Sequence, residues 1–203
     1  MRQLVIATKN VGKLRELQRY LKNVPADVVA SGDFGHTPRI VEDGETFKAN
    51  ASKKAVVTSR FTKGLVLADD SGLSVNALDG APGVRSSRFA GPKKRDKDNN
   101  SKLLRLLTGL PVGKRQAKFI CAIAIADNGK IVKIVEECCK GRIAFASKGR
   151  HGFGYDSLFL IPKYAKTFGE LGLKVKDKMS HRSKALKKAR KFLKNYLNNR
   201  FMI

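Results

Sequence analysis

Seven consecutive residues, 67–73, place two carboxylates, a hydroxyl and a glycine directly after an apolar run. The run 65–68 predicts a short buried strand, and Asp69 and Asp70 follow it. Two adjacent carboxylates repel each other, and a cation between them relieves the repulsion. Carboxylate oxygens suit Mg²⁺, which usually binds through one or two carboxylates plus substrate phosphates. We therefore expect either a metal site in an open loop after the strand or an ordinary turn with solvated acids.

A second polar segment, 8–13, lies between a predicted strand at 3–7 and a predicted helix with Leu14, Leu17 and Leu21 on one face. At a glycine-containing turn in this position, backbone N–H groups and the positive end of the helix dipole point toward a bound ligand. Its two lysines add charge for phosphate, although the segment is not a Walker A loop. An ordinary strand-to-helix connection would have the same composition, so both interpretations remain open.

The segment 148–156 interleaves glycines with Phe153 and Tyr155 and ends at Asp156. Aromatic rings stack on any base, so specificity requires an acid or amide nearby. Asp156 could provide this specificity by accepting a hydrogen bond from an N–H group of the base. The alternative is a glycine-rich hairpin loop whose aromatic rings pack into the core.

The last predicted helix begins after Ser180, a good N-cap, and carries His181 and Arg182 in its first turn. A lone His is more often structural than catalytic, but free N–H groups in a first turn favour anions and so indicate a binding role for this His and Arg. Thr46 is predicted to cap an earlier helix in the same way.

The sheet is expected to be mixed. Asn128 and Gly129 separate the apolar runs 117–126 and 130–135, which is a strong hairpin signal. The segment 141–145 should continue the sheet, and 157–161 should form a strand that Pro162 stops. Helices before and after the hairpin predict an α/β fold with a mixed sheet.

The 203 residues are enough for one large domain or two small lobes. No apolar run reaches membrane-spanning length, and the first residues become polar too soon for a signal peptide. Cys138 and Cys139 are neighbours, a poor geometry for a mutual bridge, so three free thiols in a reducing cytoplasm are expected.

The net charge of +25 would attract polyanions. The basic residues are spread over several predicted helices rather than gathered in one motif. We therefore favour solvated surface lysines and expect no nucleic-acid partner. A nucleic-acid-binding module remains the main alternative from another class, although no RNA-recognition or zinc-finger signature is present.

Taken in order, several segments resemble the inosine/xanthosine triphosphate pyrophosphatase family, also called the Ham1 family. The resemblance runs from residue 3 to about residue 190. Its motifs are ATKNVGK at 7–13, EDGETF at 42–47, NA at 50–51 with KA at 54–55, ADDSGL at 68–73, GAPG at 80–83, GFGYD at 152–156 and SHR at 180–182.

The resemblance implies a long mixed sheet flanked by helices, as a single domain of two lobes with a nucleotide cleft between them, and a homodimer. It also implies Mg²⁺-dependent hydrolysis of ITP, dITP and XTP to the monophosphate and pyrophosphate. Such an enzyme would cleanse the nucleotide pool and prevent incorporation of these nucleotides into DNA and RNA. A related pyrophosphatase that acts on other triphosphates remains an alternative.

The resemblance also assigns roles to residues. Glu42 and Asp70 are expected to bind the metal, and Asp70 is also the expected general base. The family usually has an acid where this chain has Ala49. The expected substrate-binding residues are Thr8, Lys9, Asn10, Val11, Gly12, Lys13, Lys54, Ser71, Phe153, Gly154, Tyr155, Asp156, Lys176, His181 and Arg182.

Overall fold

Seven strands form one sheet in the part of the chain that the computed structural model describes, residues 2–35, 37–93 and 95–199. The strands are β1 (Gln3–Ile6), β2 (Asp27–Ala30), β3 (Leu65–Val75), β4 (Gln116–Asp127), β5 (Lys130–Ile143), β6 (Phe159–Ile161) and β7 (Lys166–Thr167). The α-helices are α1 (Val11–Leu21), α2 (Phe47–Thr62), α3 (Asp96–Leu106), α4 (Phe168–Met179) and α5 (His181–Asn198).

The order across the sheet is β2-β1-β3-β4-β5-β6-β7. β1 pairs in parallel with β2 and β3, whereas β6 pairs antiparallel with β5 and β7. The predicted α/β fold with a mixed sheet is therefore confirmed. No helix in the described residues is long and apolar enough to cross a membrane.

The chain divides into two compact units, and the division falls within β3, β4 and β5. Unit 1 comprises Met1–Asp70, Cys121–Glu137 and Lys184–Ile203. Unit 2 comprises Ser71–Ile120 and Cys138–Ser183. In β3 the boundary between the units falls between Asp70 and Ser71. The two carboxylates of this strand therefore belong to unit 1, and Ser71 belongs to unit 2.

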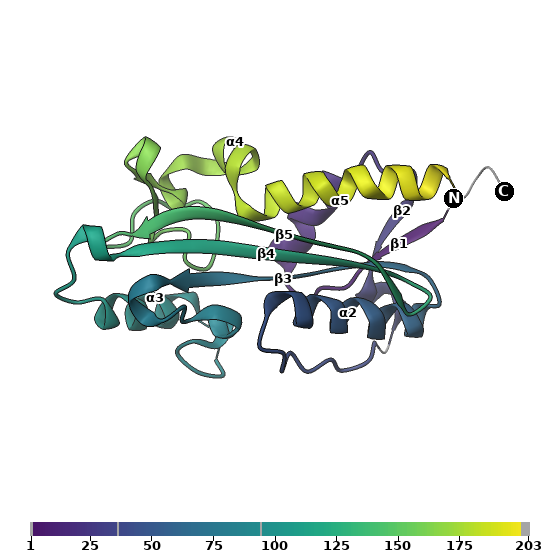
Figure 1. Cartoon of the computed structure of the whole chain (residues 1–203), viewed down its shortest axis with the longest axis horizontal. Helices are drawn as coiled ribbons and strands as arrows, with labels where there is room; N and C mark the ends of the chain where they lie inside the picture. Colours follow the sequence, from purple (N-terminus) through teal and green to yellow (C-terminus); the bar gives the residue numbers. More distant parts are fainter. Residues whose placement is uncertain (1, 36, 94, 200–203) are drawn as a thin grey trace. The chain divides into compact units, whose positions relative to one another are not determined.

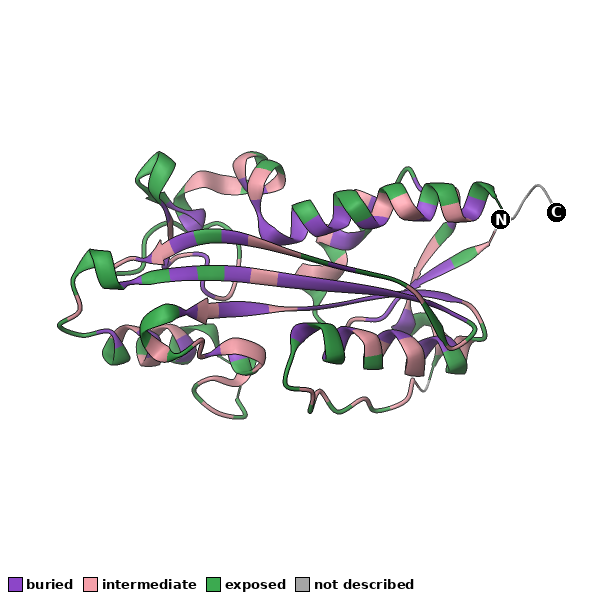
Figure 2. Ribbon diagram, in the orientation of Figure 1, coloured by how far each residue is buried: buried purple, intermediate pink, exposed green. Residues whose placement is uncertain are grey.

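In unit 1, α2 and α5 lie on opposite faces of the sheet (Figure 1). The α5 face packs through Leu186, Leu193 and Leu197 against a cluster that includes Leu17 of α1 and Ile123 of β4. The exposed residues of α5 lie on its other side (Figure 2). The apolar stripe of a 3.6-residue period thus fixes which face of α5 meets the sheet.

Unit 2 has its own core, in which aromatic rings from β4, β6 and α4 meet. The ring of Phe159 lies 4.4 Å from that of Phe119 and 5.4 Å from that of Phe168, centroid to centroid. Leu103 of α3 and Leu73 of β3 belong to the same buried cluster. This core supports the loop that carries the predicted base-binding residues.

The predicted turns and caps are confirmed. Asn128 and Gly129 have φ of 46° and 77°, and they join β4 to β5 by the two-residue turn that a hairpin favours. Thr46 accepts from the backbone N–H of Ala49 at 3.1 Å. Ser180 accepts in the same way from Ser183 at 3.1 Å. Side-chain oxygens therefore satisfy N–H groups at the starts of α2 and α5.

The prediction that a strand ends at Ala68 and opens into a loop was wrong. β3 continues to Val75, so Asp69 and Asp70 lie inside the strand. Gly72 has no room for a side chain, because Ser86 lies against it and accepts from the N–H of Leu73 at 2.9 Å. A glycine that reads as a turn residue here permits close packing against the strand.

The predicted strand at 157–161 is also shorter than expected, because β6 begins at Phe159. The N–H groups of Leu158 and Phe159 both bond to the carbonyl of Tyr155, at 2.9 and 3.0 Å. A tight turn therefore leads into the strand.

Candidate active site

Asp69 and Asp70 each face a lysine from a different helix of unit 1. Successive side chains of a strand point to opposite faces, so the two carboxylates diverge. Oδ2 of Asp69 lies 3.1 Å from Nζ of Lys13 in α1. Oδ1 of Asp70 lies 3.7 Å from Nζ of Lys54 in α2. Each carboxylate thus has a positive charge that offsets the cost of its burial.

Lys54 also connects Asp70 to a second carboxylate, since its Nζ donates to Oε1 of Glu42 at 2.7 Å. Burial raises the pKa of Asp70, although Lys54 and Lys13 act in the opposite direction. Burial by itself would lower the pKa of Lys54, but Asp70, Asp69 and Glu42 outweigh it and raise that pKa. A buried carboxylate with a raised pKa is better matched to proton transfer than a solvated one.

Glu42 and Asp70 fit a Mg²⁺ ion by the chemistry of their donors. Both present hard carboxylate oxygens, and both converge on one positive charge, the Lys54 ammonium. The described residues include no group of three or more His, Cys, Asp or Glu that could hold a metal. Because Mg²⁺ retains waters and recruits substrate phosphates, two carboxylates are a sufficient protein contribution.

The turn before α1 has the predicted form. Oγ1 of Thr8 accepts from the N–H of Asn10 at 3.2 Å, and Oδ1 of Asn10 accepts from the N–H of Lys13 at 3.0 Å. Asn10 is therefore the N-cap of α1. Lys9 and Val11 are exposed. Phosphate binding by 8–13 stays a prediction, although the strand, turn and helix N-terminus it depends on are present.

Unit 2 brings together four of the residues predicted to bind the substrate. Nζ of Lys176 lies 2.6 Å from Oδ2 of Asp156, a buried ion pair, and the same oxygen accepts from the N–H of Phe153 at 2.9 Å. The half-buried ring of Phe153 has Lys176 at 5.0 Å and the guanidinium of Arg182 at 5.5 Å from its centroid. Asp156 thus closes its own loop while two cations flank the aromatic ring.

The remaining predicted residues of unit 2 differ in their surroundings. Arg182 donates to Oγ of Ser71 at 2.9 Å, which links the start of α5 to β3. His181 is buried, and its ring stacks on that of Phe119 at 4.7 Å. Tyr155 is buried too and donates to the carbonyl of Ser86 at 2.8 Å. The side chain of Tyr155 therefore anchors the loop to the unit 2 core.

Sequence reasoning missed three residues that the structure places around these groups. Phe119 lies in an apolar strand run, and nothing in that pattern distinguishes it from an ordinary core residue. Asp96 and Asn100 of α3 contact the backbone of Gly154. Their spacing of four residues places them on one helix face, which is the signal that could have indicated a shared partner.

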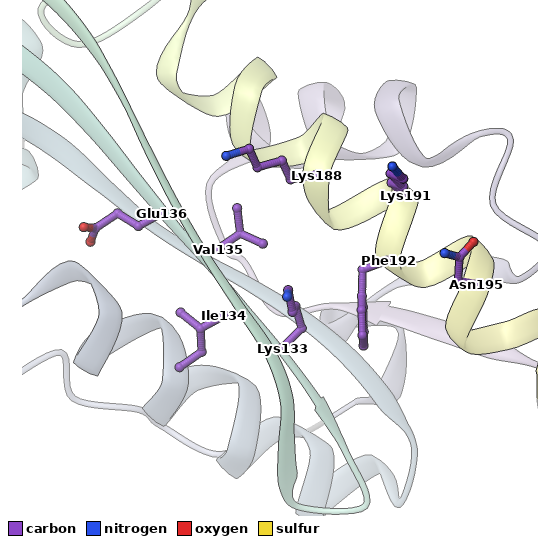
Figure 3. Close-up of a pocket in the computed structure, with 8 residues that line it drawn as sticks. All are labelled: Lys133, Ile134, Val135, Glu136, Lys188, Lys191, Phe192 and Asn195. Carbon is purple, nitrogen blue, oxygen red and sulfur yellow. The ribbon is translucent and has the colours of Figure 1, made fainter.

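A groove of about 510 Å³ in unit 1 lies apart from these groups, between β5 and α5 (Figure 3). Its lining of described residues includes no predicted site residue. The lining residues are Lys133, Ile134, Val135, Glu136, Lys188, Lys191, Phe192 and Asn195.

The sequence comparison identifies the class of protein: the chain belongs to the Ham1 family, whose model matches residues 4–192. A dITP/XTP pyrophosphatase from Desulforamulus reducens is 51% identical over 191 residues, which cover 94% of this chain and 95% of that protein. A dITP/XTP pyrophosphatase from Geobacillus kaustophilus is 47% identical over 188 residues, covering 93% and 92%.

Solved structures agree with this assignment. A HAM1 protein from Coxiella burnetii superposes with a TM-score of 0.89 at 36% identity, covering 96% of this chain and all of that one. A nucleoside-triphosphatase described as a dITP/XTP pyrophosphatase, from Mycobacterium abscessus, gives a TM-score of 0.77 at 37% identity, covering 92% and 98%.

Proposed function

We propose that this chain hydrolyses the non-standard purine nucleoside triphosphates ITP, dITP and XTP to the monophosphate and pyrophosphate, with Mg²⁺. The observation that carries the proposal is the buried Asp70 carboxylate, whose pKa is raised and which shares Lys54 with Glu42. Support comes from relatives 44–51% identical to this chain that are named dITP/XTP pyrophosphatases.

Hydrolysis between the α and β phosphates needs a water aimed in line and charge neutralised on the leaving pyrophosphate. In the proposed mechanism Asp70 orients this water and accepts its proton. Lys9, Lys13 and Lys54 attract and hold the phosphates, together with the remaining residues of the turn 8–13. Mg²⁺ bound by Glu42 and Asp70 would add positive charge on the phosphate oxygens.

Selection of the base falls to unit 2 in this proposal. Phe153 stacks on the purine, and His181 and Arg182 donate to the 6-oxygen. Adenine has an amino group in place of that oxygen, so ATP would leave both donors unpaired. Guanine adds a 2-amino group that a pocket without an acceptor would leave unsatisfied. The substrate-binding set is completed by Ser71, Gly154, Tyr155, Asp156 and Lys176.

The proposal extends to the setting of the enzyme. The chain would act as one domain of two lobes and as a homodimer in the cytoplasm. By removing ITP, dITP and XTP, it would keep these nucleotides out of DNA and RNA. The reduced thiols expected for Cys121, Cys138 and Cys139 from the sequence would fit that setting.

One panel of substrates tests the activity. ITP, dITP, XTP, GTP, dUTP and ATP are compared with Mg²⁺, and pyrophosphate release is scored against release of single phosphate. We expect pyrophosphate from the first three, with kcat/KM at least tenfold above that of the others. Release of single phosphate, or equal turnover of ATP and ITP, would contradict the proposal. Preference for dUTP would indicate the related pyrophosphatase instead.

Nucleic-acid binding is a second candidate, favoured by the charge of +25 and by exposed lysines along α5. Those lysines are Lys184, Lys187, Lys188, Lys191 and Lys194. The test is a gel shift with single-stranded and duplex DNA at several salt concentrations. A salt-dependent shift without metal-dependent turnover would favour this candidate over the enzyme.

A further inference from the structure

We propose that Asp96 and Asn100 of α3 are positioning residues, which hold the loop 152–156 in place for recognition of the purine base. The role rests on the proposed function, because that function assigns the base to Phe153. Neither residue was indicated by the family motifs, and both contacts lie within unit 2.

Both residues bind the same backbone position. The N–H of Gly154 donates to Oδ2 of Asp96 at 2.7 Å, and Nδ2 of Asn100 donates to the carbonyl oxygen of Gly154 at 3.1 Å. The two side chains are one helical turn apart, so they project from one face of α3. Together they fix both polar groups of a residue whose φ is +63°. That left-handed conformation favours glycine, which is otherwise free to move.

Asp96 has a contact that its place in the helix does not require. It is the first residue of α3, where an acid favours the helix dipole, and its carboxylate also accepts from a residue 58 positions along the chain. A bond to a charged acceptor is stronger than a neutral one, so this contact can hold a loop.

The far end of the loop is anchored in the core. Tyr155 donates to Ser86, and Asp156 meets the buried ammonium of Lys176. Gly152 lies so close to the Asp156 carboxylate that a side chain there would clash with it. None of these contacts involves a residue of α3. Asp96 and Asn100 add the restraint next to Phe153, so removing them should loosen the ring rather than unfold the unit.

The variants are Asp96→Ala, Asn100→Ala and the double variant, each assayed with ITP and GTP. We expect KM for ITP to rise about tenfold in the double variant while kcat stays within twofold, because the phosphate and water groups are untouched. The ITP preference over GTP should shrink. Asp96→Asn keeps an acceptor for the Gly154 N–H. Its KM for ITP should therefore lie closer to that of the unsubstituted chain than to that of Asp96→Ala.

Asp98→Ala is the matched control, since it removes the same charge from an exposed position two residues away on α3. It should leave KM unchanged. Two readouts do not depend on turnover: the affinity for inosine monophosphate, expected to fall about tenfold, and amide hydrogen exchange at 153–154, expected to quicken. Thermal melting checks that the variants are folded.

The outcomes separate the two proposals. Lack of ITP turnover in the unsubstituted chain would overturn the proposed function and this role with it. With turnover present, unchanged KM, monophosphate affinity and amide exchange in the double variant would overturn the role of Asp96 and Asn100 alone. An equal effect of Asp98→Ala would do the same, because charge rather than contact would then be responsible.

Discussion

The ammonium of Lys54, which is half-buried, lies 3.7 Å from the buried carboxylate of Asp70 within unit 1. The neighbouring carboxylate, Asp69, has Lys13 at 3.1 Å instead. Two adjacent acids therefore have separate counterions on separate helices. Asp69 still raises the pKa of Asp70, whereas Lys54 and Lys13 lower it, so the two lysines offset part of the repulsion that suggested a cation between the acids. The metal assignment must rest on Glu42 and Asp70, which share Lys54.

Replacement of Asp70 by Asn should remove most of the turnover and leave nucleotide binding largely intact. The amide keeps the size of the side chain but cannot accept the proton of the attacking water. Loss of a general base costs about 10²- to 10⁴-fold in kcat. The measurement is steady-state hydrolysis of ITP beside calorimetric binding of inosine monophosphate. Asp27→Asn, at the exposed first position of β2, is the control. Full activity of Asp70→Asn would rule out the proposed base.

The same variant should be more stable than the unsubstituted chain at neutral pH. Because the pKa of Asp70 is raised, the folded state binds its proton more tightly than the unfolded state. Its contribution to the free energy of unfolding is therefore present below the ordinary Asp pKa and is lost as pH rises through the folded pKa. Urea unfolding from pH 4 to pH 8 should show that the free energy of unfolding of Asp70→Asn exceeds that of the unsubstituted chain by an amount that grows with pH. An advantage that shrinks over this range would contradict the raised pKa.

The sequence predicted the parts of the fold that local chemistry determines. The Asn128-Gly129 turn requires positive φ at both residues, and the structure has it. The caps at Thr46 and Ser180 follow from the preference of hydroxyl side chains for helix starts. Strand extent could not be predicted at Asp69 and Asp70, because their burial depends on Lys13 and Lys54, which lie far away in the sequence.

The candidate site could be proposed from the sequence to the extent that its residues have unusual chemistry. Asp70, Phe153 and Arg182 stand out by type and spacing, whereas Asp96 and Asn100 resemble the solvated face of any helix. Their four-residue spacing indicates a shared helix face, but it does not identify their partner, which is the backbone of Gly154. Residues that position a site through main-chain bonds are therefore the ones a sequence conceals.

Replacement of Glu42 by Gln should weaken the dependence on Mg²⁺ without removing activity entirely. The amide retains an oxygen ligand but loses the negative charge that a hard cation prefers. We expect the Mg²⁺ concentration for half-maximal turnover to rise about tenfold or more. Titration of Mg²⁺ after treatment with a chelator measures it, and saturating metal should restore much of kcat. An unchanged titration would place the metal on another acid, with Asp43 and Glu45 the nearest in sequence.

Replacement of Arg182 by Ala should reduce the discrimination between ITP and GTP. Arg182 flanks the ring of Phe153 and donates to Ser71, so its guanidinium has a fixed direction for contacting a base oxygen. Loss of a charged donor costs about 10- to 100-fold in kcat/KM for ITP. The loss of kcat/KM for GTP should be smaller, because a poorly positioned base makes a weaker hydrogen bond to Arg182.

The variant Arg182→Lys separates the base from the phosphates as the target of this side chain. Lysine keeps the charge but not the planar fork of donors, so it can replace arginine toward a phosphate better than toward a directed base contact. We expect Arg182→Lys to resemble Arg182→Ala in its ITP to GTP ratio. Kinetics of both variants on both nucleotides decide the matter. Equal losses on ITP and GTP, restored by lysine, would mean that Arg182 serves the phosphates.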